Sequence, residues 1–219
     1  MAKKAVSKSS IKLGFQDYLL SEAKFPETVR ILTKYLKITE ASFFEHFGSL
    51  QKVEETIWTD YYQNTLDVLI KDGDFESMDE REKHLSFLYT LLEVIKNDRS
   101  YIQYRLLHKK DFSLPKFLIH TCKTIDNSKI EWVTPPRFIP EKGQGFAQSA
   151  YRKALWKHST TMIYFWIKDD SEAAEDTDAF IEKSTRTFFD LGHLPAMESV
   201  VDLGKFFLQK MGFSKPSAA

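Results

Sequence analysis

Apolar residues recur at helical spacing along most of the chain, and the alternation that is typical of strands is scarce. Near the N-terminus, apolar residues at i, i+4, i+7 and i+8 make one helix face: Ile11, Phe15, Tyr18 and Leu19. Ser9 or Ser10 is the expected N-cap of that helix. Because only 8 glycines and 7 prolines interrupt this spacing, the sequence predicts an all-α protein.

Three more helices are expected before residue 72. The second starts within residues 25–28, where a proline suits a first helical turn and a glutamate suits the positive end of the helix dipole. The third starts at the N-cap Thr39, and the fourth runs from about Leu50 to Lys71 behind the N-cap Ser49. The third helix carries three aromatic residues that we expect to lock it onto the first two helices: Phe43, Phe44 and Phe47.

A polar break at residues 72–74 marks the expected domain boundary. It separates residues 1–50 and a connecting helix to about residue 71 from a larger C-terminal domain, residues 75–219. In the second domain, helices are expected at about residues 80–96, 98–110, 114–126, 146–169, 173–192 and 197–211. Residues 127–145 contain three prolines and two glycines, so we expect a long loop there.

Charge and cysteine content narrow the possible partners and compartments. Lys+Arg and Asp+Glu both number 31, so any nucleic-acid binding has to rest on a local basic patch. The single cysteine, Cys122, excludes a disulfide framework and fits a reducing compartment. The N-terminus does not read as a signal peptide, and no segment reaches the roughly 18 apolar residues of a membrane span. A cytoplasmic protein is therefore expected.

The residues that carry chemistry in enzymes form no recognisable pattern here. The six histidines show no spacing to another His, Cys or Glu that is typical of a metal site. A glycine-rich phosphate loop and a nucleophile elbow are also missing from the sequence. We therefore expect no catalytic residues, no metal and no cofactor, and a protein that is not an enzyme.

Residues 25–53 carry a pattern of short helix, turn and second helix. The second helix and the turn after it read Ala-Ser-Phe-Phe-Glu-His-Phe-Gly-Ser, from Ala41 to Ser49. This segment resembles the helix-turn-helix of TetR-family transcriptional regulators, in which a small residue, Leu-Tyr-x-x-Phe and a small pair precede the connecting helix. The resemblance implies a DNA-binding domain in residues 1–50 and a C-terminal domain that binds a ligand. It also implies a homodimer that binds double-stranded operator DNA.

The resemblance and the polarity of this segment together suggest which residues meet DNA. Arg30 and Lys37 are expected near phosphates, and the backbone at Thr28 is expected to offer N–H groups to them. Residues from Thr39 onward are expected at or beside base edges. The full set of expected DNA-binding residues is Thr28, Arg30, Lys37, Thr39, Glu40, Ser42, Phe43 and His46.

Four residues depart from the family's pattern. Leu50 stands where the family usually has a phosphate-binding lysine, and Lys37 stands where the turn usually has glycine. Glu40 and Glu45 place two negative charges on the expected recognition helix, and carboxylates repel phosphates. These departures leave open an alternative, in which the helical segment keeps the fold but has lost or weakened DNA binding.

The C-terminal part carries a second resemblance. The pieces Tyr151-Arg-Lys, Asp170-Ser, Asp176-Thr and Phe180-Ile look like the C-terminal domain of the ubiquinone-biosynthesis lipid-binding proteins. Those proteins are TetR-fold dimers that bind isoprenoid lipids rather than DNA. The alternative function is therefore a TetR-fold lipid-binding accessory protein with a vestigial helix-turn-helix.

Aromatic density in the C-terminal domain predicts a site for a small apolar ligand or lipid. The expected lining residues are Tyr101, Tyr104, Phe117, His120, Trp156, Thr160 and Tyr164. The last two helices each carry an apolar face, and we expect these faces to form a homodimer interface. The residues of that interface are Phe180, Ile181, Phe188, Phe189, Val200, Leu203, Phe207 and Leu208.

Overall fold

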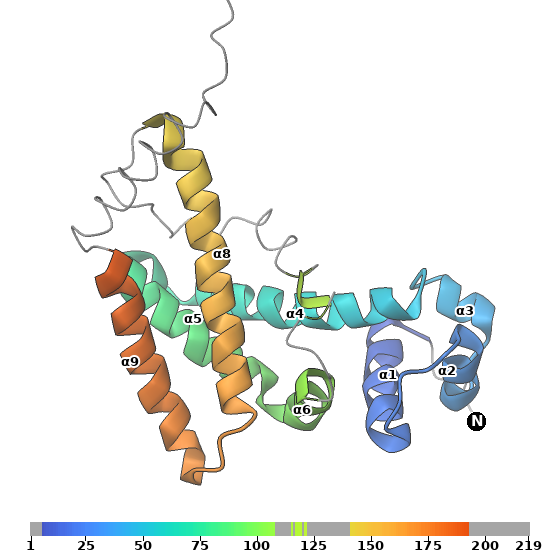
Figure 1. The fold of residues 1–219 in the computed structure, drawn as a ribbon. Coiled ribbons are helices and arrows are strands. Elements are labelled where there is room, and N and C mark those ends of the chain that lie inside the picture. The colour runs from blue at the N-terminus through green and yellow to red at the C-terminus, as the bar shows by residue number, and fades with distance from the viewer. Residues whose placement is uncertain (1–5, 108–114, 116, 120, 122–140, 193–219) are drawn as a thin grey trace, which may run out of the picture.

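One long helix, α4 (Leu50–Lys71), joins two groups of helices that lie toward its two ends (Figure 1). This computed structural model describes residues 6–107, 115, 117–119, 121 and 141–192. The secondary structure of these residues is entirely helical, which confirms the predicted all-α fold class. The bounds of α4 agree with the predicted fourth helix, and Asp72 ends it where the polar break begins.

Three helices form the N-terminal group: α1 (Lys8–Glu22), α2 (Val29–Leu36) and α3 (Glu40–Phe44). A hydroxyl N-cap precedes each of them and α4, and each accepts a hydrogen bond from the third backbone N–H of its helix. The caps Thr39 and Ser49 were predicted. The cap of α1 is Ser7, rather than Ser9 or Ser10, because Ser7 and Ser10 complete a reciprocal capping box. Helix α2 starts after residues 25–28, because Thr28 is its cap.

The three N-terminal helices share an apolar core that continues along α4. Its side chains of 4% exposure or less include Ile11, Phe15, Leu19, Leu32, Phe43 and Phe47. Phe44, which we expected to lock α3 in place with them, is instead 52% exposed. Each residue turns a helix by about 100°, so the position beside Phe43 points away from the core face.

The second group holds α5 (Glu80–Ile95), α6 (Arg99–Leu107), α8 (Glu141–Trp166) and α9 (Glu175–Gly192). Short 3₁₀ turns, η1 (Phe75–Ser77), η2 (Lys96–Asp98) and η3 (Glu172–Ala174), precede three of them. Helix α5 packs along α4 and also contacts α8 and α9 (Figure 1). The core of this group is continuous with that of the N-terminal group through α4.

Two predicted segments need correction or fall outside the described residues. Helix α8 begins at Glu141, so Gly143 and Gly145 belong to a helix and not to the predicted loop 127–145. A helical glycine costs only about 1 kcal/mol, which a helix of 26 residues tolerates. Helical backbone at 117–119 and 121 falls within the predicted helix 114–126. Residues 127–140 and the predicted helix 197–211 lie outside the described residues.

Every helix in the described part of the chain is too short or too polar to cross a lipid bilayer.

Lys37 ends α2 in the left-handed conformation, with φ 56° and ψ 40°. Its backbone N–H donates to the carbonyl oxygen of Lys34 at 3.2 Å, and the Ile38 N–H donates to that of Thr33 at 3.0 Å. These two bonds fix a turn that favours glycine, which has no β-carbon to clash. The chain therefore holds a lysine where the backbone is strained.

Replacing Lys37 with glycine is expected to raise the free energy of unfolding by about 1 kcal/mol, because glycine adopts this conformation without the clash. Urea unfolding at neutral pH measures the change. Lys37→Ala is the matched control, since it removes the same charge but keeps the β-carbon. Equal unfolding free energies for the two variants would contradict the strain argument.

Candidate nucleic-acid interface and its joint to the bundle

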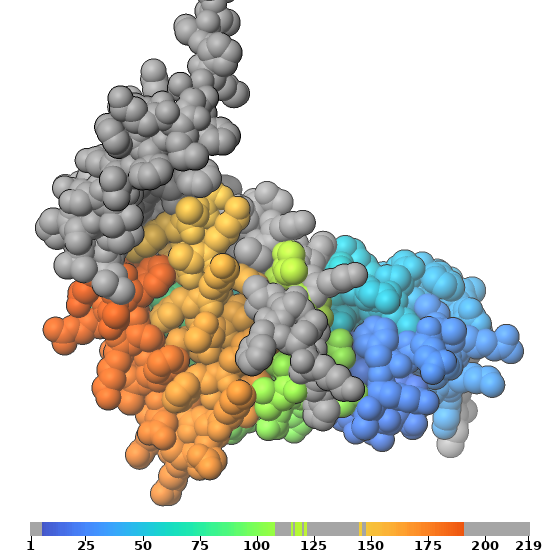
Figure 2. Space-filling view, viewed as in Figure 1, coloured from blue at the N-terminus to red at the C-terminus, as the bar shows by residue number. Residues whose placement is uncertain are grey.

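The outward surface of α3 lies at the end of the molecule that is farthest from α5, α8 and α9 (Figure 1). In the space-filling view this end is the blue part of the surface, well apart from the orange helices (Figure 2). The exposed residues of α3 and its caps are Thr39, Glu40, Ala41, Phe44 and Glu45. The hydroxyls of Thr39 and Ser42 lie 2.9 Å apart, and the Ser42 N–H donates to Thr39 Oγ1 at 3.0 Å. The two hydroxyls thus hold the first turn of α3, while Ser42 itself is only half-buried.

Two of the residues predicted at base edges have other partners in the structure. Phe43 is fully buried and packs edge-on against Phe44, with ring centroids 5.5 Å apart. Its side chain therefore anchors α3 in the core, and the prediction that it reaches a base edge is wrong. The Nε2–H of His46 donates to the carbonyl oxygen of Val6 at 3.1 Å, which ties the turn after α3 to the start of α1.

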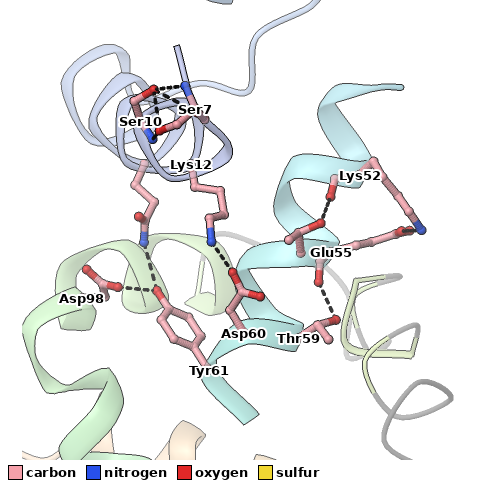
Figure 3. A network of polar contacts seen from close by, with 11 residues as sticks. Ser7, Ser10, Lys12, Lys52, Glu55, Thr59, Asp60, Tyr61 and Asp98 are labelled. Carbon is pink, nitrogen blue, oxygen red and sulfur yellow. Dashed lines mark hydrogen bonds and ion pairs between the residues drawn. The ribbon is translucent and has the colours of Figure 1, made fainter. Parts of the chain in front are cut away.

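Positive charges flank α3 and are missing from it. Arg30, Lys34 and Lys37 are exposed on α2 and its last turn, and Thr28 is exposed at the start of α2. Lys52, in the first turn of α4, forms an ion pair with Glu55 at 3.0 Å (Figure 3). Exposed cations therefore precede α3, whereas Glu40 on α3 and Glu45 at its C-cap carry exposed carboxylates.

A chain of hydrogen bonds joins α1 to α4 and to the turn before α6 (Figure 3). The side-chain amide of Gln16 donates to the hydroxyl of Tyr61 at 2.9 Å, and that hydroxyl donates to Asp98 Oδ2 at 2.6 Å. Lys12, one turn before Gln16 on α1, forms an ion pair with Asp60, which precedes Tyr61 on α4. These groups line a shallow groove of about 140 Å³. Burial and the Asp98 carboxylate raise the pKa of Tyr61, so its hydroxyl keeps the proton that it donates.

A buried ion pair holds α6 against α4. Arg105 of α6 donates to both carboxylate oxygens of Glu54, at 2.5 and 3.1 Å, and Glu54 is only 5% exposed. The guanidinium carbon also lies 5.3 Å from the ring centroid of Phe25, which precedes α2, and 5.6 Å from that of Phe117. Phe117 in turn stacks on Trp58 of α4 at 5.1 Å. Arg105 thus links α6 to α4 and to the segment that precedes α2.

Two histidines meet between α5, α8 and α9. His84 Nε2 and His158 Nδ1 lie 2.9 Å apart, and His158 Nε2 lies 2.9 Å from the hydroxyl of Ser184. Aromatic rings surround the pair, including Phe87, Phe188 and Phe189. Burial lowers the pKa of His84 to about 3, with a further lowering from His158, and burial lowers that of His158 to about 4. Both rings are therefore neutral at neutral pH.

The residues predicted to line a ligand site belong mostly to the core. Tyr101, Phe117, Trp156 and Thr160 are each 8% exposed or less, and the Thr160 hydroxyl donates to the carbonyl oxygen of Trp156 at 3.0 Å. Burial raises the pKa of Tyr101 well above its ordinary value. Tyr104 and Tyr164 are half-buried against the same core, and His120 lies outside the described residues.

The apolar face of α9 packs inside its own chain. Ile181 is fully buried and Phe189 is 5% exposed, so neither side chain is free to face a second copy. Phe180 stacks on Phe165 at 4.3 Å, and Phe188 stacks on His158 at 5.5 Å. The prediction that Ile181 and Phe189 face a second copy is therefore wrong, whereas for the half-buried Phe180 and Phe188 it stays a prediction. The other four predicted interface residues, Val200, Leu203, Phe207 and Leu208, lie outside the described residues.

Comparison with known families supplies a match over most of the C-terminal part. The family described as "Tetracyclin repressor-like, C-terminal domain" matches residues 83–207, which is more than half of the chain. The chain belongs to the TetR family of transcriptional regulators. No curated protein matches it.

Sequence reasoning missed the polar contacts that connect the helices of this TetR-family chain. His84 and His158 are 74 residues apart, and Glu54 and Arg105 are 51 residues apart, so no local spacing links them. One sequence feature does point to Glu54. It shares a helical face with Trp58 and Tyr61, and a carboxylate on such an apolar face calls for a buried partner.

Replacing Tyr61 with phenylalanine is expected to lower the free energy of unfolding by about 2 kcal/mol, because it removes two hydrogen bonds and leaves the Gln16 amide unpaired. Urea unfolding measures the loss, and hydrogen exchange should show faster exchange in α1. Tyr35→Phe is the control, since its hydroxyl also donates to a carboxylate, Asp17 at 2.6 Å, but in an exposed place. An equal loss of unfolding free energy in the two variants would contradict a stabilising role for the buried hydrogen bonds of Tyr61.

Acid should destabilise the protein through His84. Its pKa is about 3 in the folded chain and 6.5 when unfolded, so below pH 6.5 only the unfolded state gains the proton. The free energy of unfolding should therefore fall by about 1.4 kcal/mol per pH unit between pH 6.5 and pH 3 from this group. His84→Gln should remove that slope, as measured by urea unfolding at pH 7 and pH 5. Parallel pH dependences of wild type and variant would contradict it.

Proposed function

We propose that this protein is a DNA-binding transcriptional regulator that acts as a homodimer and responds to a ligand. The observation that carries the proposal is the arrangement of α2, α3 and α4. Helix α3 is short, has an exposed face and lies at one end of the molecule (Figure 1). The N-caps of the helices before and after it are Thr28 and Ser49. Exposed cations at Arg30, Lys34 and Lys37 supply the charge that phosphates require.

In this proposal the residues divide into two roles. Arg30, Lys37 and the backbone N–H groups behind Thr28 contact phosphates. Thr39, Glu40, Ala41 and the residues that follow on the exposed face of α3 meet base edges. Phe43 supports the helix, and Ser42 and His46 help to hold its ends.

The ligand response would act on the contacts of Arg105. Tyr101 and Tyr104 lie on the same helix as Arg105, and Phe117 touches its guanidinium group. These side chains pack in or against the core, so an apolar ligand that enters between them would have to displace α6 and with it Arg105. Because Arg105 also contacts Phe25 and Glu54, the shift would reach the helix-turn-helix. Such a ligand regulates DNA binding only if its affinity differs between the free and DNA-bound forms.

The homodimer contact is proposed for residues 197–211, where Val200, Leu203, Phe207 and Leu208 share one helical face in the sequence. The exposed face of α9 contributes polar residues such as Glu182, Lys183 and Arg186.

A second candidate function is a lipid-binding accessory protein that does not use its helix-turn-helix. The exposed carboxylates of Glu40 and Glu45 on α3 favour it, because they repel phosphates. In that case the same chain would carry a lipid in its aromatic C-terminal part, and a lipid would co-purify with it.

The test is a mobility-shift titration with sheared genomic DNA at low and raised salt. Wild-type protein should shift the DNA at low salt, and Lys37→Glu should weaken binding to all sequences alike and reduce the salt slope by about 1. Lys71→Glu, which reverses an exposed charge at the far end of α4, is the matched control and should bind as wild type. A wild-type protein that shifts no DNA at low salt would reject the proposed function and favour the lipid-binding candidate.

A further inference from the structure

Phe44 is the one exposed aromatic side chain among those whose burial the structure describes; every other is buried or half-buried. It lies on α3 and is 52% exposed, whereas its neighbour Phe43 fills the core. The ring of Phe43 packs against that of Phe44 edge to face, with the two planes at 89°. Part of the Phe44 ring therefore contributes to the fold through Phe43, and the exposed part adds apolar surface to the outward face of α3.

The residues around Phe44 form a surface of unusual composition for a helix that meets DNA. Glu40, Ala41 and Phe44 share one helix face, since Phe44 follows the other two by four and three residues. Glu45 is exposed beside them. Helix α3 and its C-cap together expose an aromatic ring, a methyl group and the carboxylates of Glu40 and Glu45, and they contain no lysine or arginine.

This composition fits the centre of a major groove better than its sides. The sides of the groove present phosphates, which the exposed cations Arg30, Lys34 and Lys37 suit. The centre presents base edges, and the thymine C5-methyl group is the apolar feature among them. A carboxylate can accept a hydrogen bond from the N4 amino group of cytosine. The charges of this end of the molecule therefore match phosphates outside and pyrimidine edges inside.

We infer that α3 reads C5-methylated pyrimidine edges, with Phe44 and Ala41 packed on a thymine methyl group and Glu40 or Glu45 beside a cytosine amino group. The inference rests on the proposed function, because it names the DNA feature that the same surface recognises. Phe44 is a specificity-determining residue in this arrangement, and the lysines of the flanks determine affinity without regard to sequence. A cytosine that carries a C5-methyl group presents the same apolar feature at the same place.

The experiment compares duplexes that differ only in the C5-methyl group. A randomised duplex library is enriched on wild-type protein, and the most enriched sequence is synthesised once with thymidine and once with deoxyuridine throughout. Wild-type protein should bind the uracil duplex about fourfold more weakly for each methyl group that α3 covers, and more than about tenfold more weakly across two half-sites. Fluorescence anisotropy at fixed salt measures both affinities.

Phe44→Ala should bind the two duplexes equally, and Phe44→Leu should keep part of the difference. Because uracil also changes the shape of the duplex, a difference that persists in Phe44→Ala would overturn the inference. The salt slope should stay unchanged in both variants, since the phosphate contacts remain. Thermal unfolding should shift only slightly in Phe44→Ala, because the substitution removes a single edge contact with Phe43 from a ring that is 52% exposed.

The outcomes separate this inference from the proposed function. If wild-type protein enriches no sequence and binds no duplex, both are rejected. If it binds the enriched duplex but treats thymine and uracil alike, DNA binding stands and the reading by Phe44 is overturned. If the preference for thymine is present in wild type and absent in Phe44→Ala, the inference is supported.

Discussion

The burial of one carboxylate on α4 constrains the whole arrangement. Glu54 is 5% exposed, and an unpaired charge at such a position costs several kcal/mol. Arg105 removes that cost with two hydrogen bonds, so α6 has to pack where its guanidinium group reaches α4. The rings of Phe25 and Phe117 then enclose the cation from two further segments. One ion pair thus fixes the connecting helix, the bundle and the start of the helix-turn-helix relative to one another.

Local chemistry made the helix starts predictable. Thr39 and Ser49 cap α3 and α4 as predicted, because an N-cap depends only on the next few residues. The cap of α1 was misplaced because Ser7 and Ser10 cap each other, in a box that lacks the usual glutamate or glutamine. The start of α8 was misplaced for another reason. Its glycines suggest a loop, but a long helix can include them at a small cost.

The candidate site was less predictable, because two neighbouring residues of the same type can differ in whether they are buried or exposed. Phe43 and Phe44 are equally apolar in the sequence, and only the packing of α3 decides which one enters the core. The same limit applies to α9. Its spacing correctly indicates an apolar face, but a sequence cannot tell whether that face covers its own chain or a second copy. Here Ile181 and Phe189 cover their own chain.

The contacts between the two helical groups set the free-energy change that a ligand would have to produce in order to affect the other group. Coupling between two sites in one protein is typically about 1–3 kcal/mol. The hydrogen bond from Tyr61 to Asp98, which involves a charged acceptor, is worth a similar amount by itself. A ligand therefore does not need to unfold or rebuild either group of helices. A shift of α6 that lengthens this bond, or that moves Arg105 away from Phe25, already costs as much as regulation requires. Asp98 is the last residue of η2, directly before α6, and Arg105 lies on α6, so one small movement of α6 changes both contacts.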